Sequence, residues 1–247
     1  MNLIERVHGR YVHNRRVRIL SDHLAKLIPK DARVLDVGCG DGMLAHLITQ
    51  QRPDIDLRGI DVLVRSLIHI PVDEFDGDVI PFGDMSFDVV MFVDVLHHTD
   101  NPLILLREAA RVASKAVVIK DHTLNGLFAG STLRLMDWIG NERYGVALPY
   151  NYWPQQRWFE AFQALGLKIG TWEKDLKLYP RPADWIVGRS LHFVARLFMG
   201  LFICLWLTSP KKIESVSTIN KPFLPRPTYS RKLDRAVNSP SILLTVM

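Results

Sequence analysis

The sequence predicts an α/β fold, a Rossmann-like, doubly wound and mostly parallel sheet of seven strands with an antiparallel strand last. Short apolar runs of strand length alternate with stretches of helical periodicity between residues 33 and 122. A glycine-rich turn, Gly38-Cys39-Gly40-Asp41-Gly42, separates the first of these runs from a helical stretch. The second run ends in an acid, Asp61. Strands that alternate with helices in this way form parallel sheets with right-handed connections.

The individual elements follow from the spacing of apolar residues. A first helix is expected over residues 11–29, where apolar residues recur at helical spacing until Pro29. Asn101 and Pro102 begin another helix, because asparagine is a favoured N-cap and proline suits the first turn. Further helices are expected from Met43, over residues 127–138 and from Pro154. Short apolar runs predict strands at 34–37, 57–61, 87–95, 116–119, 167–172 and 191–197.

Length and composition define the expected domain organisation. A chain of 247 residues, 48% of them hydrophobic, can bury the core of one α/β domain. We expect this domain over residues 1–208, with residues 121–153 as an inserted lid or acceptor segment because they are long for one connection. Residues 209–247 contain five prolines and seven Lys or Arg against two acids, so their charge is 7 − 2 = +5. This composition predicts a basic, disordered tail.

Charge and hydropathy also limit the expected partners and location. The tail accounts for the whole net charge of +5, so the folded body is balanced and no nucleic-acid partner is expected. The chain has only two cysteines and its first residues lack the apolar core of a signal peptide, which favours the cytoplasm. Residues 197–207 are strongly apolar but shorter than the roughly 20 residues that span a bilayer. Because this apolar run leads into the basic tail, residues 197–232 are a candidate for peripheral membrane contact. A buried helix and a dimer contact are the alternatives, and the sequence does not indicate the oligomeric state.

The glycine turn and Asp61 are the strongest functional pattern. Glycines allow a ligand to approach the backbone closely, and the following helix offers free N–H groups. Asp61 lies 21 residues after Gly40, where an acid can accept hydrogen bonds from ribose hydroxyls. The glycines are spaced G-x-G-x-G, and Met43 replaces the third glycine of the dinucleotide fingerprint. The spacing therefore favours a nucleoside over a pyrophosphate cofactor, although a tight turn without a ligand remains an alternative.

Four segments, in order, resemble the motifs of class I methyltransferases, which use S-adenosylmethionine. They are residues 34–42, 59–61, 76–90 and 96–112. Leu96-His97-His98 and the run from Arg107 to Val112 resemble the branch that includes the ubiquinone and menaquinone biosynthesis methyltransferases. The resemblance covers roughly residues 33–122. It departs from the family at residues 112–116, where the usual glycines are missing from a turn outside the cofactor site.

The resemblance implies S-adenosylmethionine as the cofactor and assigns its contacts. Asp36 and the backbone of Gly38 and Gly40 would border the methionine moiety. Asp61 would bind the ribose, and Asp76 would meet the adenine amino group, with Asp78 as the alternative acid in the same loop. The full expected set is Asp36, Gly38, Gly40, Gly42, Asp61, Val62, Asp76, Gly77 and Asp94. For Asp94, an ion-paired strand end is an alternative, because a carboxylate in an apolar strand needs a partner.

The acceptor side is less defined. Methyl transfer is a displacement on an already activated donor, so positioning and desolvation matter, and a base is needed only when the acceptor must lose a proton. The candidate catalytic residues, placed at strand ends, are His98, Lys120, Asp121 and His122, with packing or ion pairing as the alternative. Tyr150, Asn151 and Tyr152 are expected to form an acceptor wall, or else a staple for the following helix. No metal-ligand spacing is present.

The sequence therefore predicts an S-adenosylmethionine-dependent methyltransferase that acts on a small, hydrophobic acceptor. A non-catalytic module on the same fold, binding a nucleoside or a membrane surface, is the main alternative, because fold does not guarantee activity. A nicotinamide oxidoreductase is a further alternative that the glycine spacing disfavours. The sequence specifies neither the acceptor nor the methylated atom.

Overall fold

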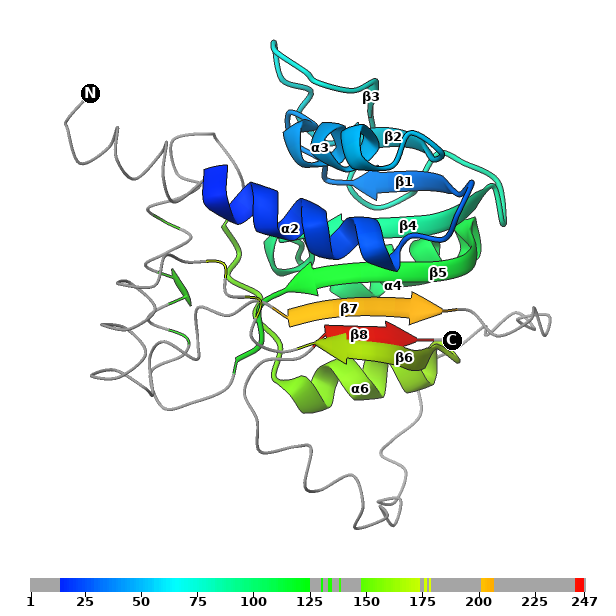
Figure 1. Cartoon of the computed structure of the whole chain (residues 1–247). Helices are drawn as coiled ribbons and strands as arrows, with labels where there is room; N and C mark the ends of the chain where they lie inside the picture. The colour runs from blue at the N-terminus through cyan, green and yellow to red at the C-terminus, as the bar shows by residue number, and fades with distance from the viewer. Residues whose placement is uncertain are drawn as a thin grey trace.

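The computed structural model describes residues 14–124, 130, 133–134, 138, 148–173, 176, 178, 201–206 and 243–246. These residues form a single sheet with helices on both faces (Figure 1). The strand order is β3-β2-β1-β4-β5-β7-β6-β8. The two hydrophobic clusters of the core lie on opposite faces of this sheet, each between the strands and one pair of helices.

Five strands form the parallel part of the sheet. They are β1 (Arg33–Val37), β2 (Asp56–Asp61), β3 (Val72–Glu74), β4 (Phe87–Val93) and β5 (Ala113–Asp121). The middle strands are buried on both faces, and for this reason they read as nearly continuous apolar runs in the sequence. The predicted parallel α/β sheet is confirmed. Strand β3 was not predicted, because three residues are too short for a recognisable pattern.

Three more strands continue the sheet beyond β5. They are β7 (Leu201–Trp206), β6 (Lys168–Glu173) and β8 (Leu243–Val246). Strand β7 runs antiparallel to both β5 and β6, whereas β8 pairs antiparallel with β6 and parallel with β7. The described sheet thus has eight strands, and the prediction of seven with the antiparallel strand last is not confirmed. The strand predicted at 191–197 lies outside the described residues.

Two of these strands, β7 and β8, differ from what was expected from the sequence. Residues 201–206, weighed as part of a membrane-associated or helical segment, form a strand paired on both sides, because a short apolar run fits a buried strand as well as a helix. Residues 243–246 of the predicted disordered tail form β8, since their Leu-Leu-Thr-Val sequence suits a strand despite the prolines and charges before it. The remaining residues of the tail lie outside the described residues.

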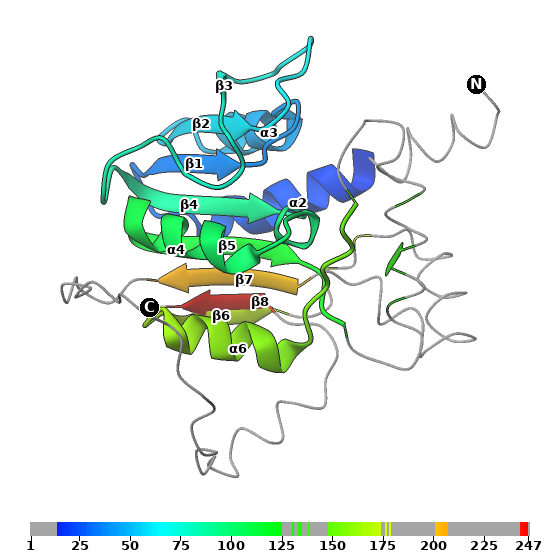
Figure 2. The same ribbon diagram turned by 180° about the vertical axis from the view of Figure 1, so that it is seen from behind.

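Helices cover both faces of the sheet (Figure 2). Helices α2 (Asn14–Leu27) and α3 (Met43–Gln51) pack on one face, and α4 (Pro102–Val112) and α6 (Gln155–Ala164) on the other. The predicted N-cap of α4 is present, since the Asn101 side chain accepts a hydrogen bond from the N–H of Leu103 at 3.2 Å. No helix in the described part of the chain is both long and apolar enough to cross a membrane.

The topology brings the candidate residues to one edge of the sheet. The carboxyl ends of the parallel strands all face this edge, and the glycine turn, Asp61 and the residues that follow β4 and β5 lie along it. A short 3₁₀ helix, η2 (Leu96–His98), follows β4 there. Thr123 and Trp153 form an isolated parallel bridge, which joins the two ends of the inserted segment 121–153 beside the same edge. The predicted helix 127–138 lies mostly outside the described residues.

Candidate active site

The turn between β1 and α3 is built on three glycines in the left-handed conformation. Gly38, Gly40 and Gly42 have φ angles of 72°, 62° and 73°. A Cβ atom at Gly38 would lie 2.6 Å from Val95, and one at Gly42 would lie 2.4 Å from Ile70. At Gly40 nothing lies within 4 Å of that position. Two of the glycines are therefore required by packing, and Gly40 leaves open space beside the backbone that a ligand can enter.

Asp61 connects the end of β2 to this turn. Its Oδ2 accepts a hydrogen bond from the N–H of Gly40 at 2.7 Å, and its Oδ1 accepts one from the N–H of Leu63 at 2.9 Å. Each carboxylate oxygen has a second lone pair. Asp61 can therefore hold the turn in place and still accept hydrogen bonds from the hydroxyls of a ribose.

Asp36 lies deeper on β1 and is only 2% exposed. Burial and, to a smaller extent, the nearby charge of Asp61 together raise the pKa of its carboxyl group to about 8. Burial also raises the pKa of the Cys39 thiol in the turn, which therefore stays protonated. The predicted methionine end of the site thus contains a carboxyl group that is largely neutral at pH 7.

The loop after β3 contains the two acids that the sequence offered for the adenine end of the site, Asp76 and Asp78. Asp76 Oδ1 accepts hydrogen bonds from the N–H groups of Asp78 at 2.9 Å and Val79 at 2.8 Å, and these bonds lower the pKa of Asp76. Gly77 has a φ of 90°, and a Cβ there would lie 3.1 Å from Val62, whose side chain is 56% exposed. Of the two acids in the loop, Asp76 organises the turn.

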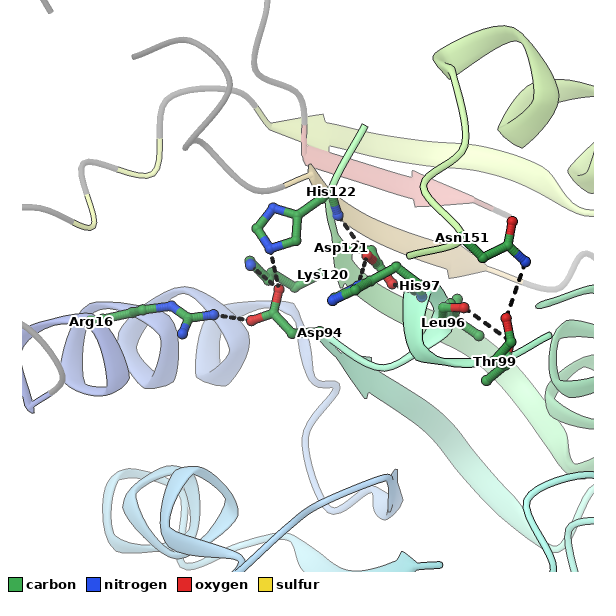
Figure 3. Close-up of polar contacts among 9 residues, drawn as sticks. All are labelled: Arg16, Asp94, Leu96, His97, Thr99, Lys120, Asp121, His122 and Asn151. Carbon is green, nitrogen blue, oxygen red and sulfur yellow. Dashed lines mark hydrogen bonds and ion pairs between the residues drawn. The ribbon is translucent and has the colours of Figure 1, made fainter. Parts of the chain in front are cut away.

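Asp94 lies at the centre of a charged cluster (Figure 3). It follows β4 with a φ of 58°, and its carboxylate pairs with Arg16 of α2 and Lys120 of β5 and lies 3.3 Å from His122 Nε2. Burial alone would raise the pKa of Asp94, but the charges of Lys120 and Arg16 hold it below its usual range. Burial lowers the pKa of Lys120, which is 1% exposed. Asp94 and Lys120 therefore have the geometry of an ion-paired strand end.

A second buried pair joins the end of β5 to η2. Asp121 Oδ1 lies 2.5 Å from His97 Nδ1, and Asp121 also accepts the N–H groups of His97 at 3.3 Å and His122 at 2.6 Å (Figure 3). Both side chains are almost fully buried. Burial would raise the pKa of Asp121, but His97 lowers it below its usual range, so the carboxylate stays ionised. An ionised acceptor at Nδ1 places the imidazole proton there and makes Nε2 the basic nitrogen.

His97 was not among the predicted residues. The sequence places two adjacent histidines after β4, and nothing in their spacing shows which ring faces Asp121. His98, which was predicted instead, is half-buried, with its ring centroid 4.1 Å from that of His97. Burial and the charge of Lys120 lower the pKa of His122 to about 3, so His122 is neutral and is a weak base.

The three residues predicted to form an acceptor wall, Tyr150, Asn151 and Tyr152, make different contacts. Asn151 Nδ2 donates to the carbonyl oxygens of Thr99 at 3.1 Å and Asp100 at 3.0 Å, and its Oδ1 accepts from Trp153 Nε1 at 3.1 Å. Asn151 therefore fastens its segment to the turn after η2. Tyr152 stacks on His97, with ring centroids 5.3 Å apart.

Tyr150 has a φ of 54°, and the guanidinium of Arg134 lies 5.6 Å from its ring centroid. Of the three side chains, that of Tyr152 stacks on His97, whereas Asn151 contacts His97 through its backbone N–H, which donates to the His97 carbonyl oxygen at 3.1 Å. Within the ranges that the structure covers, no group of three or more potential ligands could hold a metal ion.

Comparison with known proteins identifies the family to which this chain belongs. A sequence model described as a methyltransferase domain matches residues 11–171 of this chain. The chain therefore belongs to the methyltransferase domain family, and S-adenosylmethionine is its cofactor. The open space at Gly40 and the acceptor capacity of Asp61 fit the nucleoside part of this cofactor.

Two curated relatives match a part of the chain. It is 32% identical over 108 residues to the 27-O-demethylrifamycin SV methyltransferase of Amycolatopsis mediterranei and 29% identical over 106 residues to the ubiquinone biosynthesis O-methyltransferase of Neisseria meningitidis. Each match covers 38% of this chain and spans 39% and 44% of the respective relative.

A solved structure agrees on the fold. The magnesium protoporphyrin IX methyltransferase of Synechocystis, solved with bound S-adenosylhomocysteine, superposes with a TM-score of 0.53 at 14% identity, over 84% of this chain and 89% of that one. At this identity the likeness shows the fold alone. The alternatives of an oxidoreductase and of a membrane-peripheral module find no support in these comparisons.

Proposed function

We propose that this protein transfers the methyl group of S-adenosylmethionine to a hydroxyl oxygen of a small, hydrophobic acceptor. The observation that carries the proposal is the buried His97–Asp121 pair, which lies at the same sheet edge as the glycine turn and Asp61. A hydroxyl must lose its proton when it is methylated, so this acceptor needs a base beside the cofactor. One curated relative is named an O-methyltransferase and the other a 27-O-demethylrifamycin SV methyltransferase, which supports oxygen as the methylated atom.

The proposed cofactor contacts follow the geometry of the turn. Asp61 binds the ribose, Gly40 gives the cofactor access to the backbone, and Asp76 with Val62 borders the adenine. The bound cofactor supplies a methyl group that its positive sulfur has already activated. Asp36 borders the methionine end.

The chain's own residues would then orient the acceptor and take its proton. His97 Nε2 accepts the hydroxyl proton, and Asp121 fixes the ring and stabilises the imidazolium that forms. His97 Nε2 is buried, so Tyr152, whose ring stacks on His97, would move aside when the acceptor enters. Lys120 is held by Asp94 and serves to position the strand end. We propose residues 121–153, joined by the Thr123–Trp153 bridge, as the acceptor-binding segment.

A ligand screen tests the cofactor directly. We expect S-adenosylmethionine and S-adenosylhomocysteine to raise the melting temperature of the protein and NAD to leave it unchanged, because a ligand that binds only the folded state stabilises it by mass action. At a hundred times the Kd, the gain is about 2.7 kcal/mol in the free energy of unfolding. Stabilisation by NAD alone would contradict the assignment.

Asp61 offers a residue-level test of the cofactor site. We expect Asp61→Ala to weaken S-adenosylmethionine binding by roughly ten- to a hundredfold, because hydrogen bonds to a charged group contribute about 1.5–3 kcal/mol. Calorimetric titration measures the Kd. Asp73→Asn, which alters an exposed carboxylate of β3 paired with Arg58, serves as the matched control. An unchanged Kd in Asp61→Ala would remove Asp61 from the site.

The acceptor class is tested by transfer of a labelled methyl group. The protein is incubated with labelled S-adenosylmethionine and a panel of phenols, catechols and hydroxylated polyketides, alongside amines and thiols of similar size. We expect label on the hydroxyl compounds. Label confined to the amines or thiols would refute oxygen as the methylated atom while leaving the cofactor site intact.

A further inference from the structure

Among the residues that the structure describes, one buried acid of the proposed cofactor site, Asp36, has no hydrogen-bond or ion-pair partner. Asp36 is 2% exposed, and in the described part of the chain no hydrogen bond or ion pair reaches its carboxyl group. Its register neighbours are Gly59 on β2 and Met91 on β4, neither of which offers a donor side chain. A buried carboxylate without a donor is costly, so this group either holds a proton or awaits a positive ligand.

The surrounding charges favour the protonated form of Asp36. The ionisable groups on the neighbouring elements are Cys39 and Asp41 in the turn, His46 on α3, Asp56, Arg58 and Asp61 on β2, Asp88 on β4, and Asp94 after β4 with its partners Arg16 of α2 and Lys120 of β5. The guanidinium of Arg58 is paired with Asp73. Asp61 is the one that acts on Asp36, and its negative charge opposes ionisation. The cations Arg16 and Lys120 are engaged by Asp94. Nothing among these groups therefore supplies a counter-charge for Asp36.

The cofactor would bring positive charge next to Asp36. S-adenosylmethionine carries a sulfonium, an α-ammonium and an α-carboxylate group, so it is a cation overall. A positive group near a carboxyl group favours the ionised form of that carboxyl group. We propose that Asp36 is protonated before the cofactor binds and releases this proton to solvent when the cationic cofactor binds, so that cofactor binding and proton release are coupled. The inference rests on the proposed cofactor site and goes beyond it by assigning a change of charge to one residue.

The number of protons released on cofactor binding follows from the pKa of Asp36. With a pKa of about 8, Asp36 is about nine-tenths protonated at pH 7. Binding that ionises the group fully therefore releases about 0.9 proton at that pH. Below pH 7, the apparent Kd for S-adenosylmethionine should tighten by nearly tenfold for each unit that the pH rises, because removing the proton becomes easier.

Calorimetry tests this proposal. S-adenosylmethionine is titrated into the protein at pH 7 in phosphate and in Tris, whose different ionisation enthalpies reveal the number of protons exchanged. We expect a release of about 0.9 proton for the natural protein, close to none for Asp36→Asn, and the natural value for Asp56→Asn, whose exposed residue lies at the far end of β2. Equal release by Asp36→Asn and the natural protein would overturn the proposal.

A second measurement needs no variant. Infrared difference spectra of the natural protein should lose a protonated carboxyl band when S-adenosylmethionine binds. Binding without proton release and without loss of this band would refute the role of Asp36 and leave the proposed function standing. Absence of any binding would refute both, so the two failures are distinguishable.

Discussion

Asp121→Asn is expected to lower kcat for a hydroxyl acceptor by roughly a hundred- to ten-thousandfold. Asp121 Oδ1 lies 2.5 Å from His97 Nδ1, and this carboxylate holds the ring proton on Nδ1. It also compensates the positive charge that appears when Nε2 takes a proton. An amide at this position can donate to Nδ1, which would move the proton to Nε2 and leave no base. The measurement is the steady-state rate with the hydroxyl compound that accepts most label in the transfer assay.

The pH profile separates this role from a merely structural one. In the natural enzyme, catalysis by a general base should give a kcat that rises with pH and then levels off. His97→Gln should abolish this limb, and at high pH the variant should regain part of its activity as the acceptor ionises by itself. His122→Gln is the matched control, since His122 is already neutral with a pKa of about 3, and its profile should keep the natural shape. A natural profile in His97→Gln would remove His97 from proton transfer.

The cofactor half of the site could be predicted from the sequence because it is local. Gly38, Gly40 and Gly42 stand within one turn, and their left-handed backbone follows from their residue type. Asp61 ends the next strand, so the parallel pairing of β1 and β2 alone brings it to Gly40. Residue spacing and a single strand pairing are thus enough to place Asp61 against the glycine turn.

The acceptor half could not be predicted because its contacts join distant parts of the chain. His97 meets Asp121 across 24 residues, and Asn151 reaches the carbonyl of Thr99 across 52. Asn151 lies in an aromatic run, and this pattern favours a wall of the acceptor site. Its side-chain amide instead donates hydrogen bonds to backbone carbonyl oxygens. Strand β7 shows the same limit, since a central strand and an apolar helix share one sequence pattern.

Asp94→Ala is expected to destabilise the protein by about 3–5 kcal/mol, because it removes one partner of a buried ion pair. Lys120 is 1% exposed and would be left with Arg16 nearby and no carboxylate in contact. Urea unfolding at pH 7 measures the loss. Arg16→Met is the matched control: its side chain is 30% exposed, so its ion pair contributes less, about 1 kcal/mol or below.

The pH dependence of Asp94→Ala identifies Lys120 as the source of the loss. Burial already lowers the pKa of Lys120, and removal of Asp94 lowers it further. The unfolded chain then binds one proton more than the folded one between this depressed pKa and about 10.4, so the variant should regain stability as the pH rises through that window. The double variant that combines Asp94→Ala with Lys120→Met should regain most of the stability at pH 7, because it no longer buries an unpaired ammonium group. If the double variant were as unstable as Asp94→Ala at every pH, Asp94 would stabilise the left-handed turn after β4 rather than the buried ammonium group.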